Sequence, residues 1–471
     1  MNDDILYLGA AQQAALIRDR KLSPVELARA YLERIERLDG RLHAYITVTR
    51  ETALAAARRA EDAVMAGAAL GPLHGVTFAV KDQFNTRGVL TTAGSRLLAD
   101  NVPGDDATVV ARLTAAGGIL LGKLNLTEFA LGGTIRYPFG QPRNPWNTDH
   151  DTGGSSAGSG AATAAALCAV SLGEDTGGSV RSPASWCGVA GHRPTWGLVS
   201  RHGCVPLAWS LDAPGPLGRT VEDCALVLEV IAGNDPDDPL TTRRPTPDYR
   251  AALTGDVRGL RVGVIRELTL GNETDPEMRE GVLAATRVLA GLGAVVEDVS
   301  LPLVPRAGAA FMALCDSEGA ARHLATLRTR GADYDEGTRR RLLTAALLPA
   351  ALVHKAQQAR AKIRAEIHGA LRRFDVLVAP TAPRPAPTIA SYTAPITSKA
   401  QAITHFFTRR SFPTPASLAG TPALAVPCGF STAGLPLSLQ IIGRRFQDAT
   451  VLRVGHAYEQ ATEWHRRRPA L

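Results

Sequence analysis

One lysine in this chain has the surroundings of a general base. Lys81 comes directly after residues 76–80 (VTFAV), an apolar and β-branched run that predicts a buried strand. Of the 52 lysines and arginines only six are lysines, and unlike arginine a lysine can lose its proton. Burial at the end of a strand removes hydration from the amine and lowers its pKa. Lys81 is therefore a candidate base, with an ordinary salt bridge to Asp82 as the alternative.

Two segments rich in glycine and serine supply hydroxyl groups and accessible backbone N–H groups. They are residues 153–160 (GGSSAGSG) and 175–181 (DTGGSVR). Glycine allows backbone N–H groups to approach a ligand closely, so such loops bind phosphate or stabilise an oxyanion. Phosphate binding is not favoured, because the chain has no G-x-x-x-x-G-K-[ST] motif and neither loop contains a lysine. No G-x-G-x-x-G follows a predicted strand here either.

A different serine in the first loop suggests another mechanism. Residues 154–158 match G-x-S-x-G with Ser156 at the centre, which is typical of the nucleophile elbow of α/β-hydrolases. That elbow needs a strand leading directly into the serine, whereas residues 147–151 (NTDHD) predict a polar loop. No aspartate and histidine partners stand out downstream among the 11 histidines. Ser156 is therefore not favoured as the nucleophile.

Lys81 and the two loops together resemble the amidase signature family. The order of the three motifs matches that family, and so does the 24-residue step from Ser155 to Ser179. Further segments similar to the family are residues 122–129 (GKLNLTEF), 195–200 (TWGLVS), 219–223 (RTVED) and 435–443 (LPLSLQIIG). The resemblance extends over nearly the whole chain, from the first predicted helix to Arg468.

The resemblance implies a Ser–Ser–Lys relay that cleaves an amide bond through an acyl-enzyme. By motif match, Ser179 is the nucleophile, Ser155 is the bridging serine after a cis peptide bond, and Lys81 is the base. The implied oxyanion hole consists of the backbone N–H groups of Thr176, Gly177, Gly178 and Ser179. The implied supporting residues are Gly154, Ser156, Asp175 and Arg181. No cofactor and no metal are expected.

The substrate is expected to be a small-molecule amide, with ester or carbamate cleavage as a side activity. The residues predicted to line a largely apolar pocket are Phe129, Leu131, Tyr137 and Trp209, for which core packing is the alternative. The alternative function is an A-type glutaminase subunit of a tRNA-dependent amidotransferase. Such subunits carry an acidic residue for the glutamine amino group ten residues before the Leu-Ala-Gly at 418–420. Residues 409–412 (RRSF) occupy that region here, so no nucleic-acid partner is expected.

Bulk properties exclude several other classes of protein. The formal net charge of +7 is spread along the chain, which is typical of a solvated surface. The six cysteines are scattered without a C-x-x-C pair, so neither a disulfide framework nor a zinc site is predicted. No signal peptide and no apolar run of 18 residues are found, so we expect a cytoplasmic protein without a membrane segment. A monomer or homodimer is expected.

The predicted elements that must position these residues form an α/β fold with a mixed central sheet covered by helices. A strand at 76–80, a helix at 108–116 and a strand at 119–121 predict a parallel pair. In the helix at 23–38, Ser23 predicts the N-cap, Pro24 the first position and Glu26 a capping box. Further strands are predicted near 168–172, 260–266, 294–299, 375–379, 423–427 and 437–442, and further helices at 52–65 and 221–232.

The whole chain, 1–471, is expected to be one large domain. Within it we expect N-terminal helices at 1–70, a catalytic core at about 71–235, a mainly helical cap at about 304–373 and C-terminal strands with a helix at 374–471.

Overall fold

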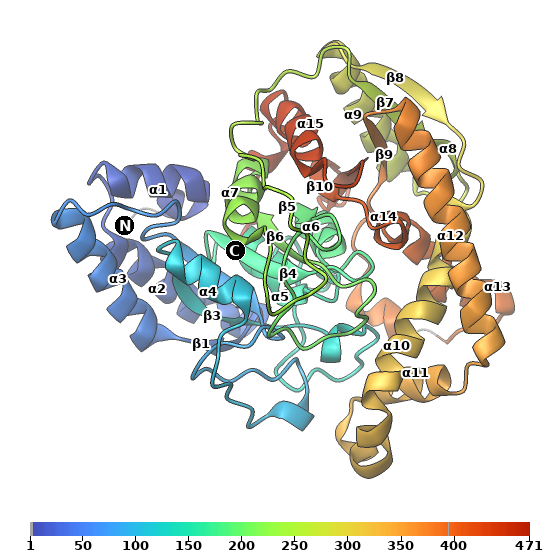
Figure 1. The fold of residues 1–471 in the computed structure, drawn as a ribbon, viewed down its shortest axis with the longest axis horizontal. Coiled ribbons are helices and arrows are strands. Elements are labelled where there is room, and N and C mark those ends of the chain that lie inside the picture. The colour runs from blue at the N-terminus through green and yellow to red at the C-terminus, as the bar shows by residue number, and fades with distance from the viewer. Residues whose placement is uncertain (1–2, 394) are drawn as a thin grey trace.

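A single mixed sheet forms the centre of the computed structural model, which describes residues 3–393 and 395–471 (Figure 1). Within this range eleven strands are ordered β1-β3-β2-β4-β6-β5-β10-β11-β9-β7-β8. The strands are β1 (Tyr45–Val48), β2 (Thr77–Lys81), β3 (Ile119–Leu124), β4 (Val170–Glu174), β5 (Ala190–Arg193), β6 (Pro214–Gly218), β7 (Arg261–Ile265), β8 (Val295–Val299), β9 (Val376–Pro380), β10 (Ala423–Phe430) and β11 (Pro436–Gly443). The predicted α/β fold with one mixed sheet is confirmed.

The strand that carries Lys81 lies between two parallel neighbours. The helix α4 (Thr108–Ala115) connects β2 to β3, and a crossover of this kind is what parallel pairing requires. On its other side β2 pairs with β4, with Val80 opposite Leu172. The carboxyl ends of β2 and β4 therefore meet at one edge of the sheet, where β2 ends with Lys81 and β4 ends with Glu174.

Alternate side chains of the central strands face two different layers of helices. On β11, Leu439 and Ile441 lie in the main core cluster, which also includes residues of α9 (Pro276–Gly291) and α15 (Asp448–Gln460). Gln440 points to the opposite face and binds Arg181, the first residue of α6 (Arg181–Cys187). This second face carries the loops that the sequence singles out.

Helices lie on both faces of the sheet (Figure 1). The remaining α-helices are α1 (Ala10–Arg18), α2 (Pro24–Leu42), α3 (Arg50–Met65), α5 (Ala157–Ala164), α7 (Val221–Ile231), α8 (Arg266–Thr269), α10 (Ala307–Arg330), α11 (Glu336–Ala346), α12 (Ala350–Arg373), α13 (Lys399–Phe406) and α14 (Thr414–Ala419). The short 3₁₀ helices are Asp3–Tyr7, Arg96–Leu98, Glu128–Ala130, Val304–Arg306, Gly331–Asp333, Ile389–Thr393, Thr408–Ser411 and Trp464–Arg466. Of the described helices, none is both long and apolar enough to cross a membrane.

The capping predictions are confirmed in part. Ser23 accepts the N–H of Glu26 at 3.1 Å at the start of α2, but its own hydroxyl donates to Glu61 of α3. Only the serine half of the predicted box is therefore formed. A reciprocal box is found at α7, where the side chains of Thr220 and Asp223 each accept the other residue's backbone N–H.

Candidate active site

Lys81 is fully buried, and its amine contacts one serine of the first loop. Its Nζ lies 2.8 Å from Ser155 Oγ and 3.4 Å from the carbonyl oxygen of Glu174. Burial lowers the pKa of Lys81, while the carboxyl group of Glu174 opposes that change. The structure thus brings together the predicted base and the predicted bridging serine.

The first loop approaches the second through backbone contacts. The Gly154–Ser155 bond is cis, as the family resemblance implies. At Gly153 the backbone has φ +79°, and a Cβ there would lie 2.8 Å from the carbonyl oxygen of Ser182, so only glycine fits. The N–H of Ser156 donates to the carbonyl oxygen of Ser179 at 3.2 Å. The loops are therefore joined at the residue that follows Ser155.

The Ser156 hydroxyl group is engaged with the backbone of β4. It donates to the carbonyl oxygen of Glu174 and accepts the N–H of the same residue, both at 3.3 Å. Its side chain is fully buried. This engagement agrees with the predicted role of Ser156 as a supporting residue.

The second loop follows β4 directly and presents Ser179, which is partly exposed, just before α6. Its shape depends on Asp175, which accepts the N–H of Gly178 at 2.7 Å and of Val180 at 3.2 Å. The Gly178 N–H is therefore directed at a carboxylate, and the predicted oxyanion role falls on the other three N–H groups of the set. Gly177 faces α10, since a Cβ there would lie 2.2 Å from the ring of Phe311.

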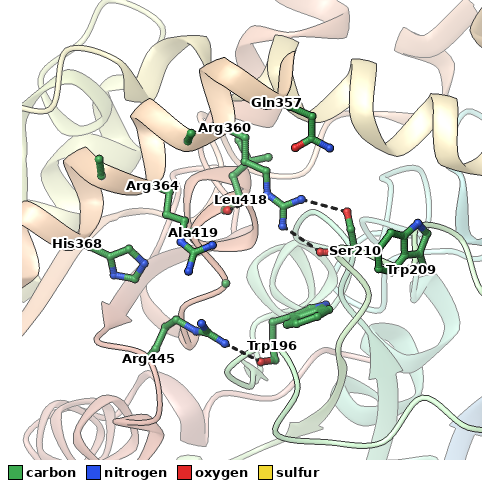
Figure 2. A pocket seen from close by; sticks show the side chains of 13 residues that line it. Trp196, Trp209, Ser210, Gln357, Arg360, Arg364, His368, Leu418, Ala419 and Arg445 are labelled. Carbon is green, nitrogen blue, oxygen red and sulfur yellow. Dashed lines mark hydrogen bonds between the residues drawn. The ribbon is translucent and has the colours of Figure 1, made fainter. Parts of the chain in front are cut away.

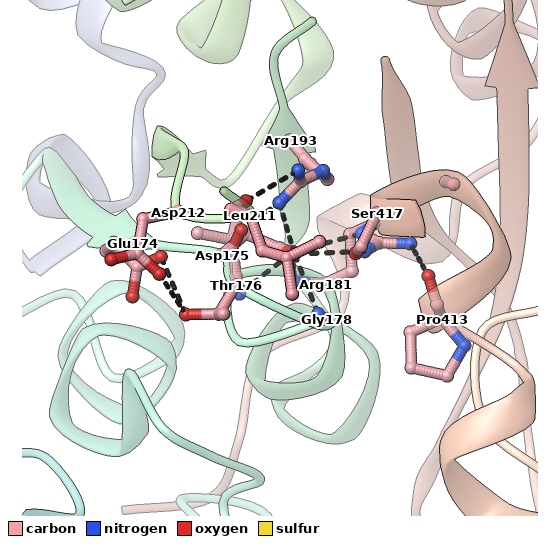
Figure 3. A network of polar contacts seen from close by, with 12 residues as sticks. Glu174, Asp175, Thr176, Gly178, Arg181, Arg193, Leu211, Asp212, Pro413 and Ser417 are labelled. Carbon is pink, nitrogen blue, oxygen red and sulfur yellow. Dashed lines mark hydrogen bonds and ion pairs between the residues drawn. The ribbon is translucent and has the colours of Figure 1, made fainter. Parts of the chain in front are cut away.

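Two buried arginines hold Asp175, as Figure 3 shows. Arg181 lies 3.0 Å and Arg193 3.1 Å from Asp175 Oδ1, and all three side chains are fully buried. Burial alone raises the pKa of Asp175, but the two guanidinium groups outweigh it and hold the pKa well below its usual range. Arg181 also donates to the carbonyl oxygen of Pro413 at 2.7 Å, and Arg193 to that of Leu211 at 2.8 Å. The second loop (residues 175–181), called the nucleophile loop below because it contains the predicted nucleophile Ser179, is thereby fixed to distant parts of the chain.

Sequence reasoning misses two of these residues. Arg193 lies outside the motifs, whereas the structure makes it a direct partner of Asp175. Glu174 belongs to none of the motifs, although it is fully buried with Oε2 3.7 Å from Lys81 Nζ. A carboxyl group beside a strand of apolar residues is the signal that points to Glu174, because acidic side chains are rarely buried without a partner.

The residues predicted to line the substrate pocket lie in different places. Phe129 and Leu131 are buried in a cluster with residues of α10 and α11. The ring centroid of Phe129 lies 4.4 Å from that of His323, with the two rings tilted by 51°. Tyr137 is half-buried in the loop that follows. Trp209 is 63% exposed and lines a separate cleft.

This cleft of about 600 Å³ contains none of the three relay residues (Figure 2). Its charged or titratable lining residues are Arg360, Arg364, His368 and Arg445, and no carboxylate of the described residues lines it. Among the described residues, no group of three or more His, Cys, Asp or Glu side chains has an arrangement that would hold a metal ion.

Comparisons with known proteins agree with this geometry. A family model described as Amidase matches residues 26–452. The chain is 44% identical to the A-type subunit of the glutamyl-tRNA(Gln) amidotransferase of Roseiflexus sp. (strain RS-1), covering 99% of this chain and 98% of that protein. A structure described as a vestigial complex that reveals the origins of an s-triazine catabolic enzyme matches with TM-score 0.89 and 34% identity, covering 96% of this chain and 98% of that chain. The structure of a bacterial aryl acylamidase matches with TM-score 0.89 and 28% identity, covering 98% of this chain and 97% of that chain.

These relatives correct one prediction. Residues 409–412 (RRSF) predict that the protein has no nucleic-acid partner. That expectation is wrong, because relatives matched over nearly their full length are named as one component of an amidotransferase for glutamyl-tRNA(Gln). The family itself is not in doubt: with a matching model over most of its length and relatives above 40% identity, the chain belongs to the amidase family, the amidase signature enzymes.

Proposed function

We propose that this protein cleaves an amide C–N bond through an acyl-enzyme on Ser179. The observation that carries the proposal is the 2.8 Å contact between Lys81 Nζ and Ser155 Oγ, made in a buried site. A neutral Lys81 takes the proton of Ser155 while Ser155 takes that of Ser179, whose oxygen attacks the amide carbon. Ser155 then returns a proton to the leaving amine, and water hydrolyses the ester by the same relay.

The oxyanion is assigned to the N–H groups of Thr176, Gly177 and Ser179. These three are left once Gly178 donates to Asp175. Each donor of this kind contributes ~2.7–4 kcal/mol to stabilising the transition state. The contacts of Asp175 with both arginines support this assignment, because they fix the loop before substrate arrives.

The biological role that we propose first is that of an A-type glutaminase subunit, which releases ammonia from glutamine for a tRNA-bound acceptor held with partner subunits. Similarity to such subunits over 98% of their length supports it. An amide other than glutamine, or a carbamate, is the second candidate. It is favoured by residues 409–412 (RRSF), because no acidic side chain is present there to hold the amino group of glutamine.

One assay separates the two roles. Ammonia or amine release is measured from glutamine, benzamide, an anilide and a p-nitrophenyl carbamate, with and without amidotransferase partner subunits and glutamyl-tRNA(Gln). Glutamine turnover that rises when the partners are added supports the role within an amidotransferase, whereas turnover of the other substrates by the chain alone supports the second. Activity that survives Ser179→Ala would exclude the acyl-enzyme proposal itself.

A further inference from the structure

A buried acid lies behind the proposed base. Glu174 ends β4 with its side chain fully buried, and its Oε2 lies 3.7 Å from Lys81 Nζ. At that distance Oε2 accepts no hydrogen bond from the amine, and among the described residues it has no other hydrogen-bond partner. An ionised carboxylate with one bare oxygen in the protein interior is strongly disfavoured, so the protonation state of Glu174 must be worked out from its contacts.

The other oxygen of Glu174 takes part in a chain of three side chains (Figure 3). The Thr176 hydroxyl oxygen lies 3.0 Å from Glu174 Oε1 and 2.8 Å from Asp212 Oδ1. A hydroxyl group has only one proton to donate, so it serves only one of the two carboxyl groups. The other carboxyl group must donate a proton to the hydroxyl oxygen, or else two lone pairs face each other.

Backbone contacts decide which carboxyl group is ionised. Asp212 accepts the N–H of Leu207 at 2.9 Å and the N–H of Ala208 at 3.0 Å. Donors of this kind stabilise the ionised form, and among the described residues no backbone N–H donates to the carboxyl oxygens of Glu174. Thr176 therefore donates to Asp212, and the 3.0 Å contact with Glu174 is favourable when Glu174 Oε1 carries the proton.

We propose that Glu174 is protonated in the resting enzyme and thereby keeps Lys81 a neutral amine, ready to accept the proton of Ser155. With Glu174 uncharged, no carboxylate of the described residues pairs with the buried amine to stabilise an ammonium ion. Glu174 is a positioning residue that acts through Lys81, and the inference rests on the proposed role of Lys81 as base.

The surroundings of the two carboxyl groups differ. Burial raises the pKa of Asp212, but the hydrogen bonds from Thr176, Ala208 and Leu207 oppose that change. Burial and then the negative charge of Asp212 raise the pKa of Glu174 to about 8, with Lys81 opposing them. Asp175 also faces the pair, but Arg181 and Arg193 neutralise it. Cys204 is the remaining titratable neighbour of Lys81, and burial raises its pKa, so it stays a neutral thiol near neutral pH.

Infrared difference spectroscopy tests the proton directly and without turnover. Wild type labelled with ¹³C-glutamate is compared with Glu174→Gln at pH 6, 7 and 9.5. We expect a protonated-carboxyl C=O band in wild type at pH 6 and 7, absent in Glu174→Gln and lost at pH 9.5. No such band at pH 6 or 7 would overturn the proposal. Thr176→Val is the second variant, in which the band is expected to move to higher wavenumber because the proton loses its acceptor.

The pH profile of kcat/KM gives an independent readout on Lys81. Glutamine preserves the shape of a protonated glutamic acid, so we expect Glu174→Gln to keep the acid limb of wild type. If Glu174 were instead ionised and paired with a Lys81 ammonium ion, removing its charge would lower the pKa of Lys81. The acid limb would then shift to lower pH by about one unit or more, which would contradict the proposal. If the amide-hydrolase proposal is wrong, wild type itself will show no amide turnover. The infrared band of wild type would still report whether Glu174 is protonated.

Discussion

The substitution Asp175→Asn tests whether the nucleophile loop depends on one buried negative charge. Asparagine keeps the size of the side chain and one carbonyl oxygen, so the N–H of Gly178 retains an acceptor. It removes the only carboxylate that pairs with Arg181 and Arg193 among the described residues, and both guanidinium groups are fully buried. The change therefore leaves two buried positive charges without a counter-charge.

The expected loss of stability follows from that uncompensated charge. Removing one partner of a buried ion pair costs about 3–5 kcal/mol. For 471 residues the entropy of unfolding amounts to ~1 kcal/mol per kelvin, at ~2.1 cal/mol/K per residue. The midpoint of thermal unfolding should then fall by ~3–5 °C. Turnover should fall as well, because the loop that presents Ser179 loses its anchor.

Differential scanning calorimetry at pH 7 measures this effect, with Asp256→Asn as the matched control. Asp256 pairs with Arg258 on the exposed surface, where such pairs contribute little, so its substitution should leave the midpoint unchanged. A midpoint for Asp175→Asn within about 1 °C of wild type would refute the reasoning.

The pH dependence provides a second check on the same charge. Because the folded state lowers the pKa of Asp175, its stabilising effect is present above the unfolded pKa of about 3.9 and is lost as the pH falls below it. The difference between wild type and Asp175→Asn should therefore be constant from roughly pH 5 to 8 and should shrink below about pH 4.

Four further substitutions address the relay and its support. Ser179→Ala should abolish turnover and labelling by a fluorophosphonate, and in wild type the label should map to Ser179. Ser156→Ala should still be labelled. A label on Ser156 would reverse the assignment. Lys81→Met should lower kcat by roughly 10²–10⁴-fold in steady-state assays while the unfolding midpoint does not fall, and a fall of less than about tenfold would exclude Lys81 as the base. Arg193→Lys should lower the unfolding midpoint by ~1.5–3 °C, because a single ammonium group cannot reach both Asp175 and the Leu211 carbonyl oxygen. An unchanged midpoint would show that the two-pronged guanidinium group of Arg193 is not needed.

The sequence predicts the catalytic strand and loops because local signals are strong there. The β-branched run before Lys81 predicts β2 to within one residue, and the glycines at 153–154 and 177–178 lie in the predicted turns. The second half of the first predicted loop, residues 157–160, instead belongs to α5. Three strands escape prediction: β1, β5 and β6. In β6 the sequence Pro-Gly-Pro-Leu-Gly has poor strand propensity, and the strand exists because β4 and β5 pair with it on either side.

The supporting contacts escape prediction for a different reason. Arg181 binds Pro413 and Gln440, which are far away in sequence, and Arg193 binds Asp175 and Leu211. No local pattern specifies such pairings. Glu174 lies just past the predicted end of its strand, and the resemblance gives its partner Thr176 only a backbone role. Single-sequence reasoning therefore finds the residues with reactive groups and misses those that tune their charge.

The contact between Arg181 and Gln440 also has a consequence for the newly made protein. The two residues are 259 positions apart, so at ~5–20 residues per second the ribosome needs roughly 13–50 s to reach the second after the first. During that interval Lys81, Ser155 and Ser179 have all been synthesised, but the nucleophile loop lacks the C-terminal groups that anchor Arg181. A chain released early by premature termination would carry Lys81, Ser155 and Ser179 and still lack the contacts of Arg181 with Pro413 and Gln440.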